Sequence, residues 1–191
     1  MAEGERILVA VTGASGAAYA RRLIEVLGTR AEVILSREAE TVIKFETGMG
    51  PGQFAEGAHR VYRGDELAAP PASGSHRFSA LVVIPCSGTT VAKIASGIAD
   101  NLVTRAAAVA LKERRTLVLV PRETPISTIA LENLLKLAHA GAVVLPASPG
   151  FYGRPREVGD LVDFIVARIL DHLDVEHDLG PRWSGPPEDD S

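Results

Sequence analysis

Five short stretches of this chain are almost continuously apolar and rich in β-branched residues. They are residues 6–11, 32–35, 80–85, 116–120 and 142–145. A strand with one face in water alternates apolar and polar residues, whereas a strand covered on both faces is apolar throughout. The pattern therefore predicts a parallel sheet with helices on both of its faces.

Between and after these stretches, apolar residues recur with the spacing of a helix, at i, i+3, i+4 and i+7. This spacing is present in residues 20–27, 131–138 and 158–169, and Gly28 and Gly141 follow the first two. Strands that alternate with helices predict a Rossmann-like, doubly wound α/β fold with a mostly parallel sheet. Ligands of such folds bind beyond the carboxyl ends of the strands.

Three segments lack either pattern. Residues 47–58 and 64–77 are rich in glycine, proline and alanine, which predicts loops. The last residues, 180–191, predict a flexible tail in which Trp183 is the large apolar side chain. The length of 191 residues suits one domain with a substantial core. We therefore expect a single α/β domain over residues 1–175, followed by a C-terminal tail, 176–191.

Composition narrows the class of protein. Apolar residues make up 46% of the chain, and the net charge of -4, without a Lys/Arg cluster, argues against a nucleic-acid binder. No apolar run reaches the roughly 18 residues that a membrane span requires. The acidic N-terminus carries no separate apolar targeting segment. The single cysteine, Cys86, cannot form an internal disulfide, so we expect a cytoplasmic protein.

Small and hydroxyl-bearing residues follow three of the predicted strands. Residues 12–16 (TGASG) follow the first, Ser36 follows the second and residues 87–90 (SGTT) follow the third. Such groups at helix N-termini bind phosphate, although the first loop could be only a tight turn and Ser36 only a helix N-cap. The GxGxxG pattern and the P-loop lysine are both missing. The loops therefore favour a mononucleotide such as FMN over NAD.

Charged and aromatic side chains follow two other strands. Arg122 and Glu123 lie between Pro121 and Pro125, which should fix the geometry of the loop. A carboxylate there could transfer protons and an arginine could hold a phosphate, although the two could instead form a surface ion pair. Tyr152 follows the last predicted strand.

Four further groups are less informative. Arg105 and Lys112 lie two turns apart on a helical stretch, Arg168 lies at the edge of the last apolar stripe, and Glu46 ends a helical run. Each could be an ordinary surface side chain. The five histidines lack metal-ligand spacing, so we expect no metal site. Cys86 is expected to be a small buried residue rather than a nucleophile.

Taken in order, these segments resemble the UbiX-type flavin prenyltransferases, which were formerly classed as aromatic-acid decarboxylases. The resemblance runs from about residue 6 to 173 with few gaps. Each piece alone is weak, but the ordered set is highly specific. The pieces are TGASG, LS at 35–36, IPCSGTTVAKIASGIADNLVTRAA, VPRETPIS, LENLLKLAHAGAVVLPASPGFYGRP and DLVDFIVARILDHL.

The resemblance implies a metal-independent prenyltransferase with a flavoprotein α/β domain. Such an enzyme binds reduced FMN and dimethylallyl monophosphate and joins the dimethylallyl group to N5 and C6 of the flavin, releasing phosphate. The product, prenylated FMN, serves a UbiD-type decarboxylase. The resemblance also implies a homododecamer whose active sites are shared between subunits.

Site residues follow from the same resemblance. The positions that match FMN contacts are Gly13, Ala14, Ser15, Ser36, Ser87, Gly88, Thr89, Thr90 and Arg122. The positions that match groups holding the prenyl phosphate are Lys112, Tyr152 and Arg168. Glu123 matches the acidic group associated with proton transfer, and Glu46 and Arg105 match site residues near the substrate, so these three are expected to be catalytic. Trp183 matches a tryptophan that some members carry near the C-terminus.

Two positions depart from the family pattern. Gly88 replaces the usual methionine of PCSM, which removes a side chain near the flavin, and Ala108 replaces the usual aspartate of RAADV. Two other functions stay open. A cysteine decarboxylase-like flavoprotein would rely on an early catalytic histidine and a PASANT-type loop, whereas the first histidine here is His59 and PASANT does not occur. A non-catalytic FMN-binding protein would not require a second phosphate site.

Overall fold

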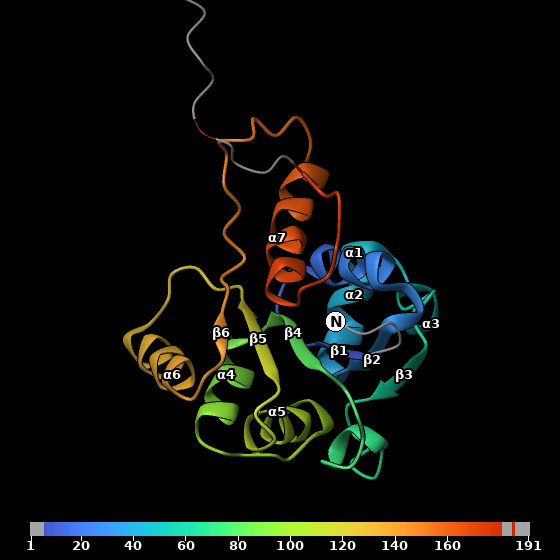
Figure 1. Ribbon diagram of the computed structural model, residues 1–191, viewed down its shortest axis with the longest axis vertical. Coiled ribbons are helices and arrows are strands. Elements are labelled where there is room, and N and C mark those ends of the chain that lie inside the picture. The colour runs from blue at the N-terminus through green and yellow to red at the C-terminus, as the bar shows by residue number, and fades with distance from the viewer. Residues whose placement is uncertain (1–5, 181–184, 186–191) are drawn as a thin grey trace, which may run out of the picture.

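The computed structural model describes residues 6–180 and 185, which form a six-stranded parallel sheet between two layers of helices (Figure 1). The strand order is β3-β2-β1-β4-β5-β6. The strands are β1 (Ile7–Val11), β2 (Ala31–Leu35), β3 (Arg60–Arg63), β4 (Ala80–Cys86), β5 (Thr116–Pro121) and β6 (Val143–Val144). The predicted doubly wound α/β fold is confirmed.

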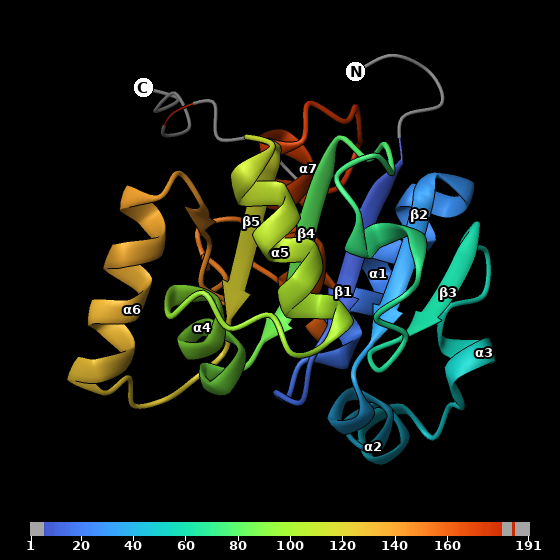
Figure 2. The same ribbon diagram turned by 90° about the horizontal axis from the view of Figure 1, so that it is seen from below.

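Two separate apolar cores lie on the two faces of this sheet. The helices are α1 (Ala17–Leu27), α2 (Arg37–Thr47), α3 (Pro51–Phe54), α4 (Gly88–Ala95), α5 (Leu102–Lys112), α6 (Thr128–His139) and α7 (Val158–His172). One core packs α1, α2, α3 and α7 against the sheet, and the other packs α4, α5 and α6. Figures 1 and 2 show α7 and α5 on opposite sides of the strands.

The central strands are almost entirely apolar because both of their faces are covered, and Glu32 on β2 is the exception. Every residue of β1, β2 and β4 is buried. The five strands expected from the sequence are all present, but the last one contains only two paired residues. The edge strand β3 was not predicted, since its sequence RVYR buries only Tyr62 and carries no apolar run.

The buried face of helix α6 differs from the one that the apolar spacing predicts. Leu134 and Leu137 pack into the core, whereas Leu131 and Leu135 of the expected stripe are 53% and 58% exposed. Val158, placed in the last stripe, is also exposed. The rest of the last stripe is confirmed, since Ile165 and Ile169 are buried and Val162 packs against the core. Periodicity alone therefore identified the core face of α7 but not that of α6.

The two segments expected to be loops contain short helical turns. Helix α3 lies within 47–58, and a 3₁₀-helix, η2 (Pro70–Ala72), lies within 64–77. A second 3₁₀-helix, η1 (Gly28–Arg30), follows α1, and Gly28 caps that helix as predicted. None of the helices in residues 6–180 is long and apolar enough to cross a membrane.

The chain reverses direction after α7 through a Schellman motif. Asp174 adopts a left-handed conformation (φ 50°), and the amides of Asp174 and Val175 donate to the carbonyls of Asp171 and Leu170. Leu173 and Val175 are buried at this turn. Residues 176–180, expected to begin the tail, therefore return along α7, while Trp183 lies outside the described residues.

Candidate functional site

The strands that follow β1 are added first on one side of it (β2, β3) and then on its other side (β4, β5, β6), so β1 and β4 are neighbours at the topological switch point of the sheet. Thr12, directly after β1, joins their carboxyl ends. Its hydroxyl donates to the carbonyl of Pro85 at 2.7 Å and accepts the amide of Ser87 at 2.8 Å. Parallel α/β folds bind ligands at such a switch point, beyond the carboxyl ends of the strands. Thr12 is buried and was not singled out from the sequence, because a lone threonine in a loop gives no signal.

The first glycine-containing loop is tightly packed. A Cβ atom at Gly13 would lie 2.5 Å from Cβ of Glu38 on α2, and Gly16 has a φ of 117°. Both positions therefore require glycine for packing and backbone reasons within this chain. The Ala14 side chain is buried, so a ligand at this loop would meet the backbone of Ala14 rather than its methyl group.

Glu46 at the end of α2 caps the N-terminus of α1. Its carboxylate accepts the amides of Gly16 at 3.0 and 3.1 Å and of Ala17 at 2.7 Å. Burial favours a higher pKa for Glu46, but hydrogen bonds from Ser15, Ala17 and Gly16, with the charge of Arg122, outweigh it and hold the pKa below its usual value. Glu46 is therefore ionised near neutral pH.

Arg122 lies beside this carboxylate. Its Nε donates to the carbonyl of Ser15 at 3.1 Å, which ties the loop after β5 to the loop after β1. The fold thus brings Ser15, Glu46 and Arg122, far apart in sequence, into one polar cluster. The amides of Gly16 and Ala17 are occupied by Glu46, so an anion at this loop would use Arg122 and groups that precede Gly16.

Two of the predicted phosphate-binding serines are also helix N-caps. Ser36 accepts the amide of Ala39 at 3.1 Å, and Ser87 accepts the amide of Thr90 at 3.3 Å. Ser36 therefore occupies the N-cap position that the sequence allowed for it. The hydroxyl of Ser87 also forms a hydrogen bond with Oγ1 of Thr90 at 3.0 Å. A hydroxyl has one proton and two lone pairs, so each serine retains hydrogen-bonding capacity for a ligand.

Gly88 begins α4 directly beside Glu123. A Cβ atom at Gly88 would lie 3.6 Å from Oε2 of Glu123, which is ordinary van der Waals contact. The loops after β4 and β5 therefore bring together two more of the predicted residues. The glycine leaves space next to the carboxylate where the family pattern has a methionine.

Arg105 and Lys112 lie on α5 and contact the loop that carries η2. Arg105 Nε donates to the carbonyl of Ala72 at 3.3 Å, and Lys112 Nζ lies 3.1 Å from Oε1 of Glu113. The same Nζ would lie 3.1 Å from a Cβ atom at Gly74. Both cations are thus next to one loop on the α5 side of the sheet.

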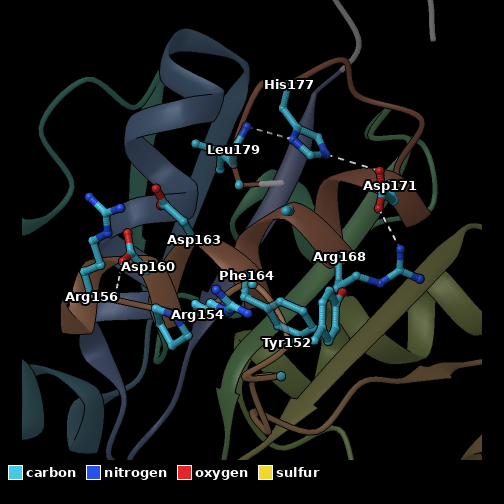
Figure 3. Close-up of a pocket in the computed structure, with 15 residues that line it drawn as sticks. Tyr152, Arg154, Arg156, Asp160, Asp163, Phe164, Arg168, Asp171, His177 and Leu179 are labelled. Carbon is cyan, nitrogen blue, oxygen red and sulfur yellow. Dashed lines mark hydrogen bonds and ion pairs between the residues drawn. The ribbon is translucent and has the colours of Figure 1, made fainter. Parts of the chain in front are cut away.

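Tyr152 and Arg168 line a cavity of about 650 Å³ on the α7 side (Figure 3). The cavity lies between α7, the loop from Gly150 to Arg156 and the returning segment at 177–180. The Tyr152 ring packs edge-on against Phe164, with ring centroids 5.7 Å apart. Arg168 Nη1 donates to Oδ2 of Asp171 at 2.7 Å.

The predicted prenyl-phosphate residues therefore do not meet within one chain. Tyr152 and Arg168 lie with α7, whereas Lys112 lies with α5 on the opposite face of the sheet (Figure 1). A single phosphate can contact all three only if a second copy of the chain supplies part of the site.

The structure also bears on metals and on Cys86. Among residues 6–180, no three His, Cys, Asp or Glu side chains are grouped so that they could hold a metal ion. Cys86 is buried, as expected, and burial raises the pKa of its thiol to about 12.

Known proteins resemble this chain over nearly its whole length. A model of the Flavoprotein family matches residues 1–170. The flavin prenyltransferase UbiX of Methanocaldococcus jannaschii is 46% identical over 180 residues, 93% of this chain and 98% of that protein. The crystal structure of AnUbiX (PadA1) in complex with FMN and dimethylallyl pyrophosphate is 43% identical, with a TM-score of 0.92 over 95% of this chain and 98% of that chain. The dodecameric FMN-dependent UbiX-like decarboxylase from Escherichia coli O157:H7 is 42% identical, with a TM-score of 0.91 over 94% and 100% of the two chains.

Proposed function

Since the chain belongs to the UbiX-type flavin prenyltransferases, we propose that it joins a dimethylallyl group from dimethylallyl monophosphate to N5 and C6 of reduced FMN. The observation that carries this proposal is the convergence of the loops after β1, β4 and β5 at one edge of the sheet. There the fold gathers Ser15, Glu46 and Arg122, and beside them Gly88 and Glu123.

The flavin is proposed to lie at this edge, with its phosphate among the capping hydroxyls and amides of the loops. The N-termini of α2 and α4 begin at Ser36 and Ser87, and helix N-termini attract anions. Arg122 adds a positive charge. Reduced FMN supplies the electron-rich ring that is alkylated.

The prenyl phosphate is proposed to bind to Lys112, Arg105, Tyr152 and Arg168. An allylic phosphate leaves when its growing negative charge is stabilised, and two or three cations with a phenol can do this. Glu123 lies next to the open position at Gly88, where its carboxylate can move a proton to or from the reacting groups. Glu46, ionised and fixed by two amides, accepts hydrogen bonds rather than donating them.

Self-association is proposed to complete the site, with the homododecamer as the assembled form. The relative from Escherichia coli is dodecameric. In this chain Phe45, Ile129, Phe151 and Val158 are between 69% and 86% exposed, and contact with a second copy would bury such side chains. We further propose that the protein acts in the cytoplasm and that a UbiD-type decarboxylase uses the prenylated FMN.

The alternatives predict different chemistry. A cysteine decarboxylase-like flavoprotein would release carbon dioxide from a cysteine derivative, and a flavin carrier would leave FMN unchanged. The identity of 46% to a flavin prenyltransferase over 93% of the chain favours prenyl transfer over both.

The test is anaerobic incubation with reduced FMN and dimethylallyl monophosphate, followed by mass spectrometry of the extracted flavin. We expect a flavin heavier by one five-carbon unit.

Glu123→Gln should retain FMN and lower the rate by about 10²-fold or more, since general acid–base catalysis contributes that much. Glu56→Gln, an exposed glutamate elsewhere, is the control and should match the unaltered protein. An unmodified flavin from the unaltered protein would refute the function, and an unchanged rate for Glu123→Gln would remove Glu123 from the mechanism.

A further inference from the structure

The returning segment after α7 is connected to Arg168 by a chain of hydrogen bonds (Figure 3). Oδ2 of Asp171 accepts from Arg168 at 2.7 Å, and Oδ1 of the same carboxylate lies 3.2 Å from Nε2 of His177. Nδ1 of His177 accepts the amide of Leu179 at 3.2 Å. One carboxylate therefore joins an exposed arginine to an imidazole in the folded-back segment.

The direction of these hydrogen bonds is fixed by the backbone. An amide can only donate, so Nδ1 of His177 must present its lone pair to Leu179, and the ring proton resides on Nε2. Nε2 then donates to Asp171. One oxygen of the carboxylate accepts from His177 and the other accepts from Arg168.

Burial increases along this chain of groups. The side chain of Arg168 is 52% exposed and that of Asp171 24%, whereas that of His177 is only 3% exposed. His177 is held in place by the Schellman turn, where Leu173 and Val175 are buried, and by Leu179, which packs on the core. A well-fixed imidazole thus anchors a carboxylate that would otherwise move with the end of the helix.

We propose that Asp171 and His177 are positioning residues that orient Arg168 toward the prenyl phosphate in the cavity it lines. This inference rests on the proposed function, because Arg168 is the proposed phosphate ligand. Arg168 has many rotamers, and holding one Nη group on Asp171 lowers the entropy lost when the remaining guanidinium donors meet an anion. Neither Asp171 nor His177 contacts the phosphate in this scheme.

The cavity supports this role for the pair. Arg168, Asp171, His177 and Leu179 all line it, together with Tyr152. The folded-back segment is therefore part of the wall of the cavity in which we place the anion, and two hydrogen bonds connect it to Arg168. From the sequence, Asp171 and His177 were ordinary polar residues near the end of a helix.

The test measures dimethylallyl monophosphate binding to the oxidised FMN complex by calorimetry, since this form does not turn over. Asp171→Asn keeps the shape but leaves a single carbonyl oxygen where Arg168 and His177 now each have an oxygen of their own. We expect the donor Kd to rise about tenfold, the value of one charge-assisted hydrogen bond, with the FMN Kd within twofold. His177→Ala should weaken the binding of dimethylallyl monophosphate in the same way. His177→Gln restores a hydrogen-bond donor to Asp171 and should recover most of the lost affinity. His172→Ala, an exposed histidine on the same helix end, is the matched control.

Steady-state kinetics provides a second readout. For both weakening variants we expect KM for the donor to rise while kcat changes by less than threefold, a division that general destabilisation would not produce. Donor affinity within twofold of the unaltered protein, or tighter binding by Asp171→Asn, would overturn the proposal, the latter by showing that Asp171 competes for Arg168. Loss of FMN affinity in parallel would overturn it as well.

The two proposals fail in different ways. If the unaltered protein binds the donor and Asp171→Asn weakens that binding, but no prenylated flavin forms, the positioning role stands and the proposed reaction fails. If the flavin is prenylated and the variants bind the donor normally, the reaction stands and the positioning role fails. If the unaltered protein binds no donor, both are refuted.

Discussion

Gly13 and Gly16 show two different reasons for a loop made of small residues. Gly16 adopts a backbone conformation that L side chains rarely adopt, with φ 117°. Gly13 makes room for Glu38, whose Cβ would lie 2.5 Å from an added Cβ. The group that closely approaches the loop at Gly13 is helix α2 of the same chain.

Gly13→Ala is therefore expected to destabilise the protein. The added methyl group must displace the backbone of α2, which costs about 1–3 kcal/mol for an overpacked site. Chemical denaturation followed by circular dichroism measures this difference. Gly52→Ala is the matched control, because nothing lies within 4 Å of a Cβ atom there, and it should change stability by less than about 0.5 kcal/mol. Equal stability of the two variants would contradict the packing argument.

Cys86 is expected to be unreactive in the folded protein. Burial raises its pKa from 9.0 to about 12, so at a given pH its thiolate fraction falls by about a thousandfold. The thiol ionises at a lower pH in the unfolded protein than in the folded protein. Its contribution to the free energy of unfolding is therefore fully present below pH 9 and is lost as the pH rises from 9 to 12. Alkylation by iodoacetamide at pH 8 should be far slower in the native protein than in urea. Similar rates in the two states would contradict the assignment.

Site residues that carry a charge or a hydroxyl of obvious chemical use could be predicted from the sequence more easily than the residues that hold them in position. The sequence singled out Ser15, Glu46 and Arg122 separately, and the fold brings them together. Thr12 and Asp171 gave no signal, since their importance lies in which distant groups they join. Such links depend on tertiary geometry, which spacing along one helix or loop does not contain.

At the scale of elements, a buried carboxylate on β2 connects the sheet to the loop beside α5. Glu32 is 3% exposed and accepts from Tyr62 on β3 at 3.2 Å and from His76 at 2.9 Å. Burial, followed by the charge of Glu32, raises the pKa of Tyr62 to about 12. Arg115 donates to the carbonyls of His76 and Gly74 at 2.7 Å, which holds the same loop from the other side.

Glu32→Ala should therefore lower the free energy of unfolding by about 2–3 kcal/mol, because it leaves the buried hydroxyl of Tyr62 and the partly buried imidazole of His76 without their acceptor. Glu32→Gln keeps one oxygen acceptor and should cost about 1 kcal/mol or less. Urea denaturation of both variants provides the measurement. A loss for Glu32→Gln as large as that for Glu32→Ala would mean that the charge, rather than the hydrogen bonds, stabilises the loop.

Elements with a strong apolar pattern were predicted well and the others were not. The apolar runs located β1, β2, β4 and β5 to within about one residue. Strand β3 was missed because only Tyr62 of its four residues is buried. The spacing of apolar residues at 131–138 predicted helix α6 but not its buried face, since Leu131 and Leu135 are exposed in a single chain.

At the scale of the whole molecule, the proposed prenyl-phosphate groups are divided between two faces of the sheet. Arg105 and Lys112 belong to α5, whereas Tyr152 and Arg168 belong to the α7 side (Figure 1). The sequence orders these residues but cannot show that they separate in the folded chain. Exposed apolar side chains on α6 and on the loop at Phe151 support an assembly in which copies bring the two sets together.

Complementation between two inactive variants tests this shared site most directly. Lys112→Ala and Arg168→Ala chains, each with a different affinity tag, are co-expressed and the mixed assemblies isolated through both tags. The flavin extracted after anaerobic incubation with reduced FMN and dimethylallyl monophosphate is then weighed by mass spectrometry. If copies share the site, some sites in the mixed assembly contain both intact residues, and prenylated flavin should form where neither variant alone produces it. Mixed assemblies as inactive as their parents would contradict the shared site.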